Sequence, residues 1–298
     1  MATAQRVLKN TSYLYFKMAI TMFVSLYTTR IVLDALGASD FGIFNIVGGA
    51  IAMLGFLNGS LSSATQRFMS YAEGEGNVQN KKKIFNASIL LHFGISVIIV
   101  VFLELAALFF FNGILSIPDD RMYAAQFIYQ CAVIATVFTV QSVPYEAVMN
   151  AHENMLYYAL IGVLESVLKL IAAIIITQTT IDHLILYGIL MALISLIMRI
   201  IMRVYCHRKY EECKFNSRLF YDRSVIKQMA GFAGWNATSA ITSIVSQYGL
   251  GIVLNHFFGT IVNAAQGITN QISGQFGALS TNAMKALSPV ITKSAGSK

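Results

Sequence analysis

Several charged side chains lie well inside long apolar runs of the sequence, among them Lys17, Arg30, Glu104, Glu165, Lys169 and Arg199. A charge in the middle of a membrane-spanning helix costs at least ~2.5–3.5 kcal/mol on insertion scales. Such a charge is therefore expected to pair with an opposite charge or to face a hydrated cavity. A cation in that position is suited to hold a phosphate, and a neighbouring carboxylate can orient the cation or carry a proton.

Lys17 begins a polar stripe that continues at helical spacing through Thr21, Ser25 and Thr28. This spacing places the four side chains on one helix face and predicts that Lys17 faces a cavity. The alternative is that the lysine stem snorkels to nearby lipid headgroups. Arg30 lies about as close to the other end of the same run, and the same two interpretations apply to it.

Glu165 and Lys169 are four residues apart and share one face of a predicted helix. They form either a pair that lowers the cost of insertion or a cavity-facing cation with its orienting carboxylate. Glu104 has apolar neighbours on both sides, and we interpret it either as a proton-coupling group or as a structural one. Arg199 is followed one turn later by Arg203, which favours anchoring at the membrane face.

Two late segments are unusually polar for apolar runs, GWNATSAITSIVSQYGLGIVLNH and the run over 261–284. Small and hydroxyl side chains either allow close helix packing or line water. Amides hydrogen-bond to hydroxyl groups, and we expect three amide side chains to line a cavity: Asn236, Gln247 and Asn270.

The overall composition is that of a membrane protein. Hydrophobic residues make up 56% of the chain, charged residues only 12%, and the mean hydropathy is +0.63. A soluble domain carries roughly 25% charged residues, and half that share cannot cover the solvated surface of a 298-residue globule. The sequence therefore predicts an all-α integral membrane protein, a polytopic helical bundle.

A helix needs about 20 apolar residues to cross a bilayer, and eight runs are candidates: 12–35, 41–64, 86–111, 122–142, 156–177, 183–206, 229–256 and 261–284. LGASDFGIFN separates the first two, and its glycines and aspartate predict a short turn at a membrane face. The second run contains several glycines that serve close packing or bending: Gly48, Gly49, Gly55 and Gly59.

Lysine and arginine gather on one side of the predicted spans, at the amino terminus, in alternate loops and in the tail. Because cytoplasmic loops are enriched in these residues, we expect both termini in the cytoplasm. VPYEAVMNAHENM also falls on this side but has no lysine or arginine, and we expect a short amphipathic helix lying at the membrane interface. The net charge of +7 then reflects topology rather than nucleic-acid binding.

The first two predicted spans can be aligned with the last two as an internal repeat. The alignment pairs Gly37 with Gly259 and Gly74 with Gly296, and each copy ends in a basic stretch and small residues. It predicts a first six-helix lobe over 1–206, a basic cytoplasmic linker over 207–228, and the first two helices of a second lobe over 229–298. We expect this second lobe to be truncated.

Four stretches resemble a known family: TTRIVLDALGASDFGIFNIVGG, LSSATQRFMSYAEGEGN, VPYEAVMNAHENMLYYALIGVLESVLKLIAA and NAMKALSPVITKSAG. They are similar to the polysaccharide (O-antigen type) flippases, in the superfamily that also holds multidrug and toxic-compound exporters and the lipid II flippases. The resemblance covers nearly the whole chain in span order and loop length. It implies a two-lobed MATE-like exporter fold with an incomplete second lobe and alternating access between two lobes arranged in a V.

The resemblance also implies the cargo, undecaprenyl-pyrophosphate-linked oligosaccharide moved across the bacterial inner membrane. Lys17, Arg30 and Lys169 are then the substrate-binding cations, and Glu165 and Glu104 are coupling or structural groups. Asn236, Gln247 and Asn270 are then the sugar-side lining of the cavity. Membrane lipid is the other expected partner, together with a polysaccharide polymerase and chain-length proteins.

The sequence contains no GxSxG, HExxH, Walker or paired DxD motif. We therefore predict no enzymatic activity and no cofactor. A membrane-embedded glycosyltransferase is disfavoured because the longest loops have only about 20 residues. A cation-coupled multidrug exporter of the same fold stays open as an alternative, as does an inactive half-transporter.

Overall fold

The computed structural model describes residues 2–52, 54–111, 117–214 and 222–297, and these residues form helices without any β-strand. Helices are expected in a bilayer because each backbone N–H and C=O must be satisfied within its own segment. Within the last helix, the side chains of residues 243–272, 274 and 275 lie outside the described set. The main helices are α1 Ala2–Ala52, α2 Gly55–Glu75, α3 Val78–Phe109, α4 Met122–Val140, α5 Val143–Ala151, α6 Met155–Thr177, α7 His183–Lys209 and α8 Arg223–Gly296.

Five stretches of the described residues are long and apolar enough to cross a membrane: Ala4–Gly49, Val78–Phe109, Asp119–Ala151, Met155–Thr177 and His183–Lys209. The chain is therefore a multi-pass membrane protein. The predicted spans from the first to the sixth fall wholly or partly within these stretches. The two spans predicted inside α8 are not among the five and stay a prediction.

The helix α1 contains two antiparallel arms that meet at Gly37. This glycine has φ 71° and ψ 171°, a conformation that is strained for a residue with a Cβ. The predicted turn is therefore present, but it is confined to one residue, and helix resumes directly after it. Because the reversal is so tight, the two arms lie close enough to line the same cavity, as described below.

The second predicted span is interrupted where α1 ends at Ala52 and α2 begins at Gly55. Four glycines lie around this interruption, and a Cβ at any of them would meet no neighbouring atom within 4 Å: Gly48, Gly49, Gly55 and Gly59. Close packing therefore does not explain these glycines. The interruption agrees with the other interpretation, a bend in the helix.

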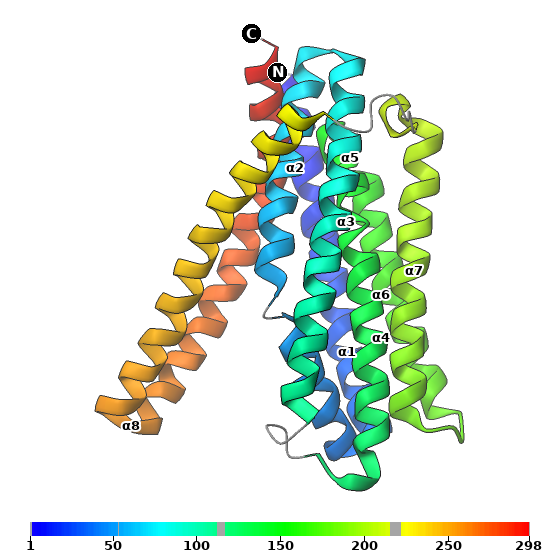
Figure 1. The fold of residues 1–298 in the computed structure, drawn as a ribbon, viewed down its shortest axis with the longest axis vertical. Coiled ribbons are helices and arrows are strands. Elements are labelled where there is room, and N and C mark those ends of the chain that lie inside the picture. Colours follow the sequence, from blue (N-terminus) through cyan, green and yellow to red (C-terminus); the bar gives the residue numbers. More distant parts are fainter. Residues whose placement is uncertain (1, 53, 112–116, 215–221, 298) are drawn as a thin grey trace.

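The helix α8 also contains two antiparallel arms, an outgoing arm that starts at Arg223 and a returning arm that ends at Gly296 (Figure 1). A straight helix would place Phe232 and Lys293 about 90 Å apart. Instead, the Phe232 ring lies 6.3 Å from the Phe68 ring of α2, and Lys293 lies against Gly74 of the same helix.

Both chain termini lie at one end of the molecule, which we call the terminal end; the opposite end is the far end (Figure 1). The helices α1 to α7 form a bundle, and α8 joins this bundle at the terminal end and leans away from it toward the far end. The bundle's two cores reflect this arrangement. The core near the terminal end includes Met229 of α8, whereas the core near the far end is built from α1, α3, α4, α6 and α7.

The short helix predicted within VPYEAVMNAHENM is present as α5, but its predicted position is wrong. Its side chains are buried apart from the partly buried Glu146, and it packs against α2, α6 and α7. The helix therefore lies inside the protein near the terminal end rather than on the membrane surface. Its apolar residues face other helices, so it needs no flanking lysine or arginine.

Candidate substrate cavity

A cavity of about 530 Å³ lies between the bundle and the returning arm of α8. Both arms of α1 line it, because the reversal at Gly37 brings them together. Its walls are formed by Met18, Thr21, Met22, Ser25, Thr28, Thr29, Val32, Phe41, Phe44, Asn45, Ser166, Lys169, Tyr187 and Ala278. The predicted polar stripe of the first span is thus one wall of this cavity.

The hydroxyl groups along this wall are satisfied within their own helices. Thr21 donates to the Met18 carbonyl at 3.1 Å, and Thr28 donates to the Val24 carbonyl at 2.7 Å. Each hydroxyl oxygen keeps lone pairs that can accept a further hydrogen bond. The wall is therefore stable without a ligand and can still offer hydrogen bonds to a polar one.

Lys169 is the one charged side chain among the described residues that line the cavity. Its ammonium lies 2.6 Å from a carboxylate oxygen of Glu165, and the two side chains are 43% and 40% exposed. The predicted pair is therefore present, and it lies at the cavity wall. At this exposure the pair is partly solvated, so Lys169 can exchange Glu165 for another anion at small cost.

Lys17 lies beside the cavity rather than in its wall. Its ammonium is 4.3 Å from the centre of the Tyr158 ring on α6, which is a cation–π contact. A Cβ on Gly162 would overlap the Lys17 side chain, so this glycine makes room for the lysine. Lys17 is held between helices and does not extend to lipid headgroups, as the snorkelling alternative required.

The structure does not bring Arg30 to Lys169. Arg30 is exposed and shares its helix face with Phe23 and Tyr27, which are 74% and 58% exposed. The cavity-lining residues Ser25 and Thr28 lie on the opposite side of the helix.

Glu104 is exposed on α3 and accepts a hydrogen bond from the side-chain amide of Gln130 on α4 at 3.3 Å. It does not line the cavity. This link between two adjacent helices fits the structural alternative for Glu104 better than the coupling one.

The expected sugar-side lining on α8 is only partly within the described residues. Asn236 is partly buried on the outgoing arm and is not among the cavity-lining residues. Gln247 and Asn270 lie outside the residues whose side chains are described. The one residue of α8 that lines the cavity is Ala278, at least in the described part of the chain.

Sequence reasoning missed the contacts that close the terminal end. Lys285 of the returning arm donates to the Tyr158 hydroxyl at 2.6 Å, beside Lys17. Leu14, Met155 and Ala286 are each fully buried and form a dry layer next to this contact. Lys285 directly follows the last predicted span, among the lysines of the chain's tail, and nothing in the sequence indicates a partner on α6.

The returning arm crosses α2 at backbone contact. A Cβ on Gly74 would overlap the Lys293 carbonyl, and a Cβ on Gly296 would overlap the Tyr71 carbonyl. The Lys293 ammonium lies 3.6 Å from Glu73 and 3.7 Å from Glu153; we call these two ion pairs the latch. Gly74 and Gly296 are the two residues that the repeat alignment paired, and the fold places them at one crossing.

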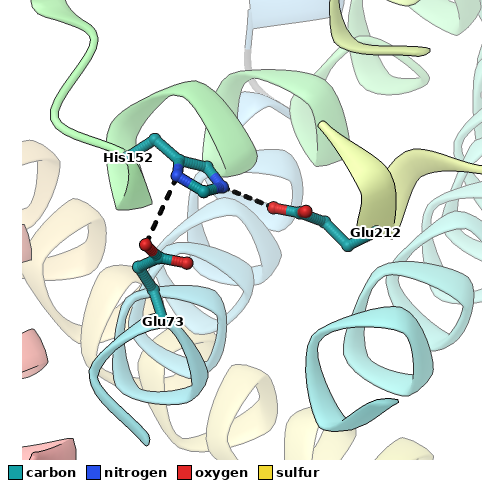
Figure 2. Close-up of side chains that lie close together, drawn as sticks. All are labelled: Glu73, His152 and Glu212. Atoms are coloured by element: carbon teal, nitrogen blue, oxygen red, sulfur yellow. Dashed lines mark hydrogen bonds and ion pairs between the residues drawn. The ribbon is translucent and has the colours of Figure 1, made fainter. Parts of the chain in front are cut away.

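Figure 2 shows a cluster that shares Glu73 with the latch, formed by the partly buried Glu73 of α2 and His152 after α5 and the buried Glu212 after α7. The two ring nitrogens of His152 face different carboxylates, Nδ1 toward Glu73 at 3.4 Å and Nε2 toward Glu212 at 2.5 Å. Burial raises the pKa of Glu212, but hydrogen bonds from His152 and the backbone outweigh it and leave that pKa below its ordinary range. Glu212 is therefore a buried carboxylate.

The far end holds a different ionic cluster, which we call the far-end clamp. Arg121 donates from Nε to Asp40 at 2.8 Å and from Nη1 to Asp182 at 2.5 Å, and its Nη2 also contacts both carboxylates. The clamp ties together the α1 reversal and the starts of α4 and α7. The hydrogen bond from Arg121 holds the pKa of Asp182 below its ordinary range.

No protein-family model and no curated protein matches the sequence. Solved structures do match it in fold. A multidrug resistance MATE family transporter of the MOP superfamily, in an outward-facing conformation, has a TM-score of 0.84 at 13% identity, covering 99% of this chain and 65% of its own. The Vibrio cholerae MATE transporter VcmN in its bent form has a TM-score of 0.84 at 17% identity, with 99% and 67% covered.

A third similar structure is a MOP superfamily transporter from Pyrococcus furiosus, described as having a binding pocket of reverse polarity that suggests a different function. It has a TM-score of 0.82 at 13% identity and covers 99% of this chain and 65% of its own. These likenesses show that the chain has a MATE-like fold. The chain spans about two thirds of the length of these transporters.

Proposed function

We propose that this chain translocates undecaprenyl-pyrophosphate-linked oligosaccharide across the bacterial inner membrane, with its terminal end in the cytoplasm. The observation that carries the proposal is the composition of the cavity wall. Its one charged residue within the described part is the cation Lys169, and hydroxyl side chains of α1 and α6 surround it. An anionic pyrophosphate with attached sugars needs this combination.

The arrangement of the helices supports a translocation mechanism. Neither a pyrophosphate nor a sugar can enter hydrocarbon without losing its hydration at high cost, so the cargo needs a polar path past the bilayer core. The cavity lies between the bundle and α8, which are joined at the terminal end and apart at the far end (Figure 1). In this proposal the structure is the state open to the far side, and the cargo's prenyl chain stays in lipid while the head group crosses.

The other predicted residues take separate roles in this proposal. Lys169 is the primary phosphate-binding cation, and Glu165 holds it in position when no cargo is bound. Lys17 contacts Tyr158 beside the contacts that close the terminal end. In this proposal the cargo reaches Lys17 when that end opens. Arg30 contacts lipid or cargo outside this cavity. A polymerase and chain-length proteins remain the proposed partners downstream.

A second candidate function is export of cationic drugs, for which Glu165 is the relevant observation. It is 40% exposed beside the cavity, and it could hold a drug cation if Lys169 moved away. The MATE neighbour described as a multidrug resistance transporter has the same fold. We favour the anionic cargo because the carboxylate is already neutralised and the cavity wall presents the lysine.

Ligand-induced thermal stabilisation of the purified chain in detergent separates the two functions. We expect a short-chain prenyl pyrophosphate to stabilise the chain, and the matching prenyl alcohol and tetraphenylphosphonium to have little effect. Lys169→Gln should weaken pyrophosphate binding about tenfold, the order expected for one charge-assisted contact. Lys227→Gln, which makes the same charge change at an exposed site of α8, is the matched control and should bind normally.

Stabilisation by tetraphenylphosphonium but not by the pyrophosphate would favour drug export. Equal pyrophosphate affinity in Lys169→Gln and in the unmodified chain would remove Lys169 from the site.

A further inference from the structure

A histidine and a lysine from different parts of the molecule share one carboxylate oxygen at the terminal end. His152 Nδ1 lies 3.4 Å from Glu73 Oε1, and the Lys293 ammonium lies 3.6 Å from that same atom. The other oxygen of Glu73 is occupied by Lys81 at 2.8 Å. His152 and Lys293 therefore compete for Oε1, and neither is at the ~2.8 Å of a full charge-assisted hydrogen bond.

The second ring nitrogen of His152, Nε2, forms a hydrogen bond with Glu212. That carboxylate is 3% exposed and lies 2.5 Å from Nε2. A carboxylate only accepts hydrogen bonds, so Nε2 keeps its hydrogen in every protonation state that preserves this contact. The variable proton of His152 is thus the one on Nδ1, which faces Glu73.

Lys293 joins the returning arm of α8 to the bundle by ion pairs. Its two partners, Glu73 and Glu153, both belong to the bundle. Glu153 has φ 56° and is the one non-glycine residue with positive φ in the described part of the chain. This costly conformation aims its side chain, of which only 12% is exposed, at Lys293.

We propose that His152 is a proton-binding site that sets the strength of the latch and thereby the closure of the terminal end. When Nδ1 carries a proton, it donates to Glu73 Oε1 and the latch is weakened. When Nδ1 loses its proton, its lone pair repels Oε1, which turns to Lys293, and the latch tightens. Proton binding at this site therefore favours opening of the terminal end.

The surroundings of His152 favour a proton as the ligand. Each helix or segment around it supplies a charged or titratable group: Glu73 from α2, Lys81 from α3, Lys293 from α8, and Glu212 and Tyr210 from the segment after α7. Arg6 and Lys9 of α1 line the adjoining crevice of about 300 Å³. Each carboxylate faces a different ring nitrogen of His152 (Figure 2), an arrangement that suits a proton shared between the imidazole and a carboxylate.

The role of this opening in transport rests on the proposed function, but the pH-dependent opening itself can be tested without any cargo. Spin labels at Gln79→Cys on α3 and Ser294→Cys on the returning arm report the distance across the terminal end. Both sites are exposed, and the native cysteines are buried. Distances are measured at about pH 5.5 and about pH 8, on either side of imidazole titration.

We expect the long-distance population to be about fivefold larger at the acidic pH, the factor that corresponds to losing one partly exposed ion pair. His152→Gln and Glu73→Gln should each abolish this pH response, because one removes the proton site and the other the shared oxygen. His207→Gln, at a partly buried site at the same end, is the matched control and should keep this response. Lys293→Gln should increase the open population at both pH values.

An unchanged pH response in His152→Gln would overturn the proposal, and so would a response absent from the unmodified pair. Glu73→Gln provides the same test if His152→Gln does not fold. Neither result depends on whether a pyrophosphate or a drug binds the cavity, so this inference can fail while the proposed function stands.

Discussion

Each end of this molecule contains an ionic cluster, but one cluster joins α8 to the bundle and the other joins helices within the bundle. At the terminal end, Lys293 of α8 pairs with two glutamates of the bundle, and glycines let the two parts cross at backbone contact. At the far end, Arg121 binds Asp40 and Asp182, which both belong to the bundle. The terminal cluster joins two parts, whereas the far-end clamp stiffens one.

This difference indicates where the molecule can change shape. A contact that is confined to the bundle moves with it and opposes no rearrangement of α8. The returning arm of α8 meets the bundle through partly exposed ion pairs, the Lys285–Tyr158 hydrogen bond, the dry layer and one glycine crossing, whereas Met229 and Phe232 pack the outgoing arm against the bundle. Opening of the terminal end by the returning arm therefore needs only the first set of contacts to separate, while the far-end clamp keeps the bundle rigid.

The largest expected effect comes from Gly74→Val. Any Cβ at this position overlaps the Lys293 carbonyl, so the returning arm must move away from α2. Overpacking of this kind costs about 1–3 kcal/mol, which should make the open terminal end the major state. The spin-label pair at positions 79 and 294 should report a longer distance at both pH values.

Gly59→Val is the control for this experiment, because a Cβ on Gly59 meets no atom within 4 Å. It should leave the distance unchanged. A closed terminal end in Gly74→Val would show that the crossing tolerates a side chain, and the contrast between the two ends would then rest on the ion pairs alone.

A smaller effect is expected from acidification of the far-end clamp. The pKa of Asp182 is lowered in the folded protein, so its contribution to stability is complete above its ordinary value of 3.8 and is lost as the pH falls through the lowered value. The melting temperature should therefore fall more steeply below about pH 4 in the unmodified chain than in Asp182→Asn. Parallel melting curves for the two proteins would argue against a stabilising clamp.

The smallest effect on stability is expected from Glu165→Gln, in the cavity between the two ends. The Glu165–Lys169 pair is 40–43% exposed, so its loss should change the free energy of unfolding by less than about 0.5 kcal/mol. Because Lys169 loses its resident anion, binding of the prenyl pyrophosphate should strengthen about twofold to threefold. Thermal-shift titration measures both, and weaker binding in this variant would show that Glu165 itself supports the ligand.

Several features of the candidate site were predictable because they depend on one helix. The stripe of Thr21, Ser25 and Thr28 lies in the cavity wall as the helical period required. The Glu165–Lys169 pair follows from spacing alone. Arg30 shows the limit of this reasoning, because a span gives the order of side chains around its axis but not which face meets the neighbouring helix.

The contacts at the terminal end were not predictable, because they join distant parts of the chain. Tyr158 meets Lys17 and Lys285, and His152 meets Glu73 and Glu212, only after three distant parts of the chain have packed in each case. The α5 helix was misplaced for a related reason. Its lack of cations fits a buried helix as well as an interfacial one, and only the packing of α2 and α7 distinguishes them.

The sequence by itself determined that this chain is a bundle of membrane helices, since long apolar runs leave the backbone no other way to satisfy its hydrogen bonds in lipid. It also determined the tight reversal at Gly37 and the polar face of the first span. Only the tertiary structure decided which charges meet, because an ion pair between helices depends on rotation about each axis and on vertical register. Gly74 and Gly296 illustrate this difference. The sequence shows that both residues are small, but only the fold brings them to the same helix crossing.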